Sequence, residues 1–123
     1  YTTALEMTLL EKGAQNKKKM LANRVAILIG TSPADITRIH ANMLSYYRFR
    51  SESLHEGSGA SISTTELHSL EEYVRSVLKK CLLRCKQEIA VNAATTWEEV
   101  KLKIIADLKA GVTDAKSAGI LPA

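Results

Sequence analysis

Apolar residues recur every three or four positions along four long stretches of this chain. That period is expected of α-helices that bury one face, and no stretch sustains the strict alternation of a half-buried β-strand. The spacing predicts helices over about 4–29, 33–50, 64–91 and 97–110, followed by a short tail at 111–123. We therefore expect an all-α protein.

The predicted helix starts carry capping boxes. In this motif a Ser or Thr side chain accepts from the backbone N–H three residues later, and the acidic residue at that position reaches back. The pairs are Thr3 with Glu6, Ser32 with Asp35, Ser63 with Glu66, and Thr96 with Glu99. Within the first predicted helix, Gly13 is expected to weaken the helix without ending it.

The helix at 64–91 carries the longest apolar stripe, formed by Leu67, Leu70, Val74, Val77, Cys81, Cys85 and Ile89. The helix at 97–110 repeats the pattern with Trp97, Val100, Ile104, Ile105 and Leu108. Four amphipathic helices can bury such stripes only against one another. We expect a single domain over 1–123, a bundle of four main helices with the 64–91 helix at its centre.

Two further features complete the predicted architecture. Residues 51–62 are rich in Ser and Gly, which predicts a flexible loop between the second and third helices. The apolar stripes of the helices at 64–91 and 97–110 are also suited to self-association or to a protein partner.

A distinctive turn joins the first two predicted helices. The apolar run Val25–Ile29 leads into Gly30, and Thr-Ser-Pro then opens the next helix. Ala26 leaves room for the neighbouring helix, and Gly30 is expected to adopt the positive φ of a helix C-cap. Ile36 would fill the space between the two helices. The result is a steep helix–helix corner.

Residues 25–39 resemble the helix-turn-helix of bacterial repressors of the Lac repressor type. The matching positions are Val25, Ala26, Gly30, Ser32, Ile36, Thr37, Arg38 and Ile39. The resemblance implies that the helix at 33–50 enters the major groove of DNA. Pro33, Ala34 and Arg38 would then face base edges, and Arg38 could fork onto a guanine. Ser32 and Thr37 would hold phosphates.

The same turn also suits an ordinary corner of a helical bundle, whose capped start needs the same Gly, Ser and Pro. Three positions favour that alternative. Ile27 is apolar and Thr31 is polar where the repressor pattern has the opposite, and Asp35 brings a negative charge to the DNA-facing end.

Charge permits a polyanionic partner without requiring one. The formal net charge is +4, and the excess leans toward residues 1–60. The cations expected to grip phosphate near the corner are Lys17, Lys18, Lys19, Arg24, Arg48 and Arg50. Tyr46 and Tyr47 precede Arg48 in an aromatic and cationic run of the kind that stacks single-stranded bases. Helical spacing instead sends Tyr47 to the core and leaves Tyr46 more exposed.

Candidate chemistry is sparse. Cys81 and Cys85 lie on one helical face and are expected to be reduced thiols in the core stripe, rather than a disulfide or a zinc site. The chain has no Gly-rich phosphate loop and no nucleophile or metalloprotease motif. We therefore predict no enzymatic activity, no cofactor and no metal.

The sequence thus favours a non-enzymatic, DNA-binding helical bundle. The alternative is an adaptor or assembly domain that contacts another protein and no nucleic acid. The longest apolar run, Val25–Ile29, is far shorter than the roughly 20 residues of a transmembrane helix, so no membrane insertion is expected. With neither a signal peptide nor a disulfide framework, an intracellular location is expected, cytoplasmic or nuclear.

Overall fold

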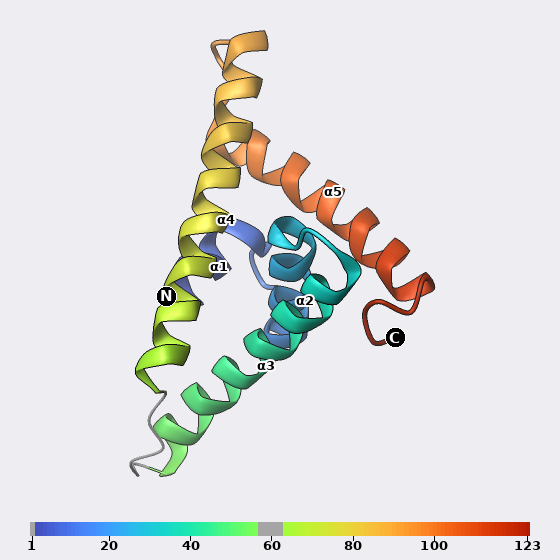
Figure 1. Cartoon of the computed structure of the whole chain (residues 1–123). Coiled ribbons are helices and arrows are strands. Elements are labelled where there is room, and N and C mark those ends of the chain that lie inside the picture. Colours follow the sequence, from blue (N-terminus) through green and yellow to red (C-terminus); the bar gives the residue numbers. More distant parts are fainter. Residues whose placement is uncertain (1, 57–62) are drawn as a thin grey trace.

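The computed structural model describes residues 2–56 and 63–123, with side chains described for 3–48 and 63–123. Five helices make up this part: α1 (Thr2–Leu9), α2 (Lys17–Ile29), α3 (Pro33–Glu56), α4 (Thr64–Val91) and α5 (Trp97–Ser117). No strand occurs among these residues (Figure 1). The all-α prediction is confirmed, as four main helices with the short α1 added.

The predicted helix at 4–29 is two helices. Gly13 has a φ of 73° and Asn16 a φ of 53°, and such left-handed residues cannot continue a right-handed helix. The chain turns between Leu10 and Asn16, so that α1 packs back against α2. Gly13 therefore belongs to a chain reversal and not to a weakened helix.

Two helices extend beyond their predicted ends. α3 continues to Glu56, so the first half of the expected loop at 51–62 is helical, while 57–62 lie outside the described residues. α5 continues to Ser117 instead of ending near 110. It passes through Gly111, where α5 lies so close to α2 that a Cβ would be 2.8 Å from Ile27 Cγ2. The limits of α4 are those predicted.

The centre of the molecule is α2, not α4 as the sequence predicted. α2 packs against α1, α3, α4 and α5 (Figure 1). Its residues Leu21, Ala22, Val25 and Ala26 are fully buried. α4 contributes Leu70, Val74, Val77 and Cys81 to the core, and its C-terminal end projects beyond the other helices.

The α2–α3 corner depends on close approach instead of positive φ. Gly30 is the C-cap residue of α2, but its φ of −70° and ψ of 137° are those of an extended conformation, so the expected positive φ was wrong. A Cβ at Gly30 would lie 2.5 Å from both Ala26 O and Ile36 Cγ1. Ile36 fills the corner as expected, and only glycine leaves room for it.

The predicted N-cap contacts of Ser32, Ser63 and Thr96 are confirmed. Each side-chain oxygen accepts from the backbone N–H of the third residue on, over 3.1, 3.1 and 3.3 Å respectively. Asp35 reaches back one residue beyond the N-cap, because its Oδ2 accepts from Thr31 N at 3.0 Å. Local hydrogen bonds that can be predicted from the sequence therefore fix the starts of three helices, α3, α4 and α5.

Replacing Gly30 with Ala should lower the free energy of unfolding by about 1–3 kcal/mol, because the methyl group overpacks the corner. Urea denaturation measures the change. The control is Gly13→Asn, which lies in open space and keeps a residue that tolerates positive φ. An effect of Gly30→Ala no larger than that of Gly13→Asn would contradict the steric role of Gly30.

Candidate functional site

The residues predicted to read DNA bases are accessible at the start of α3. Ser32, Pro33, Ala34, Thr37 and Arg38 are all exposed. The Arg38 side chain is 64% exposed and pairs with the Asp35 carboxylate one turn earlier. The backbone N–H of Thr31 and the Arg38 guanidinium lower the pKa of Asp35, and Asp35 raises the pKa of Arg38. The positive charge of Arg38 at this corner is therefore balanced by the carboxylate of Asp35.

The C-terminal tail reaches the same corner. After α5 the chain reverses at Gly119, which has a φ of 75°. The Thr37 hydroxyl lies 3.1 Å from Pro33 O and 3.2 Å from Ile120 O, and it can donate to either. Leu121 is buried. Sequence reasoning missed this contact because the bonded residues are far apart along the chain.

The predicted cations do not gather at one corner. Lys17, Lys18 and Lys19 are exposed in the first turn of α2, whereas Arg38 follows the other end of that helix. The 13 residues of α2 separate the two groups by about 20 Å. Arg48 is exposed farther along α3, and the side chain of Arg50 lies outside those described. The predicted cations therefore lie in separate groups, and the expectation of a single positive corner was wrong.

Arg24 is buried and cannot act as the surface phosphate contact that the sequence predicted. It is 3% exposed, and its Nη1 donates to Leu9 O at 2.7 Å and to the Glu11 carboxylate. The chain reversal after α1 brings both acceptors to α2. Lys109 Nζ of α5 lies 3.2 Å from Glu11 Oε2, so Glu11 joins two cations from two helices.

The aromatic run before Arg48 is part of the core. Tyr46 and Tyr47 are both buried, so the expected exposure of Tyr46 was wrong and the expected burial of Tyr47 is confirmed. The Tyr46 ring lies against that of Tyr73, with centroids 6.3 Å apart. Tyr47 donates to Glu6 Oε1 at 2.9 Å. Neither ring is free to stack on a base.

Cys81 and Cys85 are free thiols on the inner side of α4, as predicted. Cys81 is buried, and burial together with the neighbouring Cys85 raises its pKa to about 11. A thiol with such a pKa is a poor nucleophile at neutral pH. Within the described residues, no three His, Cys, Asp or Glu side chains are grouped so as to hold a metal ion.

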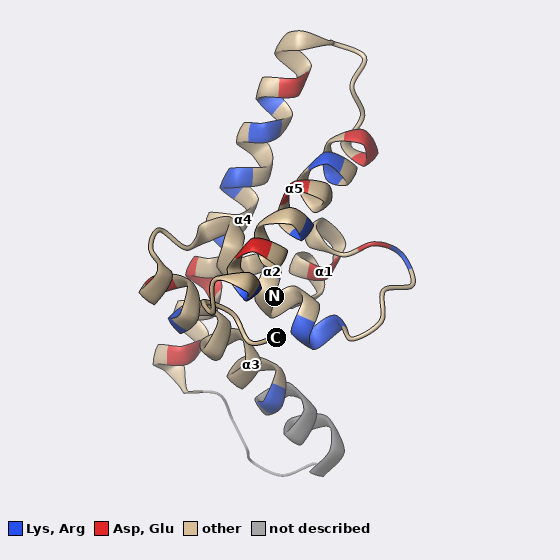
Figure 2. Ribbon diagram, turned by 90° about the vertical axis from the view of Figure 1, so that its right-hand side faces the viewer, with Lys and Arg blue, Asp and Glu red and all other residues tan. Residues whose placement is uncertain are grey.

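The projecting end of α4 exposes an apolar stripe with basic flanks. We call Leu78, Leu82 and Ile89 the α4 stripe; with the half-buried Cys85 they follow a spacing of four, three and four. Leu82 is 62% exposed and Ile89 48%, so the expected burial of Ile89 was wrong. Figure 2 shows Lys and Arg residues along this part of α4.

Ion pairs hold the projecting end of α4 against α5. Arg84 lies 2.8 Å from Asp107 and 3.0 Å from Glu88, and Lys103 lies 2.7 Å from Glu88. A groove of about 250 Å³ lies beside these pairs. Leu28, Leu83, Ile104 and Leu108 contribute apolar lining, and Lys80 contributes a cation. These ion pairs join the projecting end of α4 to α5.

Comparison with known proteins gives no family or fold assignment: no family model, curated protein or solved structure matches this chain. Among the described residues, no helix is long and apolar enough to span a membrane. Any functional inference therefore depends on the surfaces described above.

Stability should fall in acid partly through Glu11, whose pKa the Arg24 hydrogen bond lowers from 4.5 to about 2. A depressed folded-state pKa contributes stability above the unfolded value, and this contribution disappears as pH falls from about 5 to 2. The urea midpoint should therefore drop less between pH 7 and pH 3 in Glu11→Gln than in the unchanged protein. Equal drops would show that Arg24 does not act through this carboxylate.

Proposed function

We propose that the protein is a non-enzymatic interaction domain that docks an acidic amphipathic helix of a partner protein on the α4 stripe. The observation that carries the proposal is the concentration of exposed large apolar side chains on the second half of α4. Contiguous exposed apolar surface is unfavourable in water and typically marks an interaction site. Anchors spaced by three and four residues suit a helical partner.

Charge distinguishes an acidic partner from a second copy of the chain. Lys79 and Lys86 flank the stripe, and neither has an acidic partner among the described residues. In an antiparallel pair of copies with Leu82 opposite Cys85, Lys79 of one copy would lie near Lys86 of the other. Like charges across such a seam repel, whereas acidic residues on a different helix would attract both lysines.

Replacing Leu82 with Lys should weaken the binding of an acidic helical peptide by about tenfold or more, because a central apolar anchor is lost. Fluorescence anisotropy with a labelled peptide of Leu anchors and Glu flanks measures this. Leu102→Lys is the matched control, since Leu102 is 66% exposed on α5 but lies outside the stripe. A peptide with the same anchors and Lys flanks should bind much more weakly.

Two results would contradict this assignment. Equal binding of the acidic and basic peptides would remove the role of Lys79 and Lys86. A dimer seen by light scattering, and converted to a monomer by Leu82→Lys, would assign the stripe to a second copy of the chain.

DNA binding at the α2–α3 corner is the second candidate. It is supported by the exposure of Ser32, Pro33, Ala34, Thr37 and Arg38 at the start of a capped helix. Arg38 would reach a guanine, while Ser32 and Thr37 would contact phosphates. The pairing of Arg38 with Asp35 weakens this candidate relative to docking on α4, because a base contact must displace that pair.

If the corner binds DNA, Arg38→Ala should reduce duplex affinity by about 5- to 100-fold, the range for loss of one bidentate base contact. A gel-shift assay at two salt concentrations measures the affinity. Arg75→Ala removes the same charge from an exposed position on α4 and should have little effect. Equal losses of affinity from the two variants would indicate only nonspecific attraction. Failure of the unchanged protein to bind duplex DNA would rule out this second candidate function.

A further inference from the structure

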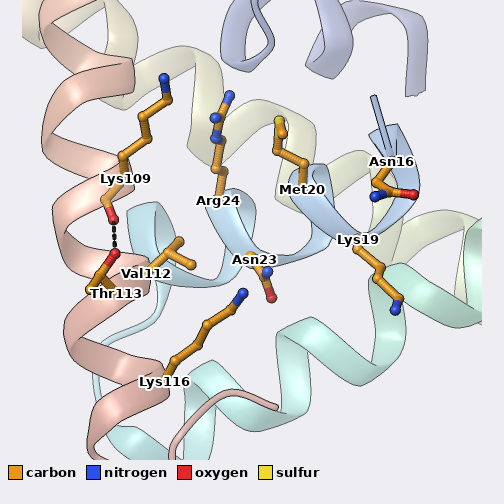
Figure 3. A pocket seen from close by; sticks show the side chains of 9 residues that line it. All are labelled: Asn16, Lys19, Met20, Asn23, Arg24, Lys109, Val112, Thr113 and Lys116. Atoms are coloured by element: carbon orange, nitrogen blue, oxygen red, sulfur yellow. Dashed lines mark hydrogen bonds between the residues drawn. The ribbon is translucent and has the colours of Figure 1, made fainter. Parts of the chain in front are cut away.

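A pocket of about 460 Å³ lies between α2 and α5 (Figure 3). Its lining includes no residue of the α4 stripe or of the α2–α3 corner. Met20 of α2 and Val112 of α5 contribute apolar walls. Asn23 of α2 and Thr113 of α5 contribute uncharged polar groups. This volume falls in the range of small-molecule sites, which combine apolar walls with a few polar groups.

The pocket has a basic lining with two distinct ends. At one end, Lys109 and Arg24 point toward α1, where both pair with Glu11. At the other end, Lys19 and Lys116 lie on either side of Asn23 (Figure 3). Neither Lys19 nor Lys116 has an acidic partner among the described residues. The second end therefore carries two uncompensated positive charges.

Asn23 contributes a polar group that the protein itself does not satisfy. Its Oδ1 is the buried side-chain oxygen that has no hydrogen-bond partner within the described part of the chain. Leaving a buried polar atom unpaired is unfavourable, so such atoms call for an explanation. A ligand hydroxyl could donate to Oδ1, and rotation of the amide would instead direct its N–H groups at a ligand oxygen.

The start of α2 adds a partial positive charge to the lining of the pocket. Asn16 lines the pocket as the N-cap residue of α2, and its side chain makes no capping hydrogen bond. The first N–H groups of a helix attract anions when no side chain accepts from them. Lys19 is in the first turn, where a cation is unfavourable unless a negative group is bound nearby.

We propose that this pocket binds a phosphate monoester that has a small apolar body. A monoester carries a charge of about −1.5 to −2 at neutral pH, which the ammonium groups of Lys19 and Lys116 would match. The Asn23 amide would hydrogen-bond the ester between them. The apolar body would lie along Met20 and Val112. This proposal is independent of docking on α4, because it uses neither the α4 stripe nor its flanks.

The test is titration of the ¹⁵N-labelled full chain with phenyl phosphate, followed by NMR. Saturable shifts are expected at the Asn23 side-chain amide and at the backbone N–H groups of Thr113 and Lys116. Inorganic phosphate and phenol each supply half of the ligand and should bind more weakly than phenyl phosphate. Duplex DNA serves as the probe for a nucleic-acid source of phosphate.

Replacing Lys19 and Lys116 together with Gln should weaken phenyl phosphate by about tenfold or more, because both charge-assisted contacts are lost. Lys12→Gln combined with Lys101→Gln removes the same charge outside this pocket and is the matched control. Asn23→Asp should also weaken binding, since it places a carboxylate between the lysines. Far-ultraviolet circular dichroism establishes that each variant is folded.

Three outcomes would overturn the proposal. The first is equal weakening by the pocket and control variants, which would reduce the effect to net charge. The second is binding of phenol as tight as that of phenyl phosphate. The third is displacement of phenyl phosphate by duplex DNA with shifts at the same residues, which would assign the phosphate to nucleic acid instead of a small molecule.

Discussion

The buried guanidinium of Arg24 is the constraint on which the arrangement of α1, α2 and α5 depends. A charge inside a protein must be paired, because its desolvation is otherwise far too unfavourable. Leu9 O and Glu11 provide the partners, and Glu11 also binds Lys109. The chain reversal after α1 is therefore required for Arg24 to be buried. Such a network specifies one arrangement even where its net contribution to stability is small.

Local features of the fold could be predicted from the sequence, whereas features set by distant residues could not. The start of α4 follows from Ser63 and Glu66, which lie on the same helical turn and need no other part of the chain. The burial of Arg24 depends on Leu9 and Glu11, and the contact of Thr37 depends on Ile120. The residues next to Arg24 and Thr37 in the sequence do not predict these partners. Arg24 was wrongly predicted to be a surface phosphate contact for this reason.

The stripe on α4 illustrates a second limit, which lies in helical geometry. Leu70, Val74, Val77 and Cys81 are buried, and the same face continues into Arg84 and Glu88, which pair with α5. After Cys81 the stripe in the sequence advances by two steps of four residues, to Cys85 and Ile89, and each such step turns by about 40° around a helix of 3.6 residues per turn. Ile89 has thus moved away from the inward face. A single stripe in the sequence becomes one buried face and one exposed face in the structure.

Capping and ligand binding compete at the α2–α3 corner. Asp35 stabilises the start of α3 by accepting from Thr31, and its other oxygen neutralises Arg38. The residue that makes this corner well defined also makes it less attractive to a phosphate. At the start of α2 the reverse holds, since Asn16 provides no side-chain cap and Lys19 has no acidic partner among the described residues. The available positive charge is therefore concentrated where helix capping is weakest, and the basic excess of the chain is better suited to the α2–α5 pocket than to the corner.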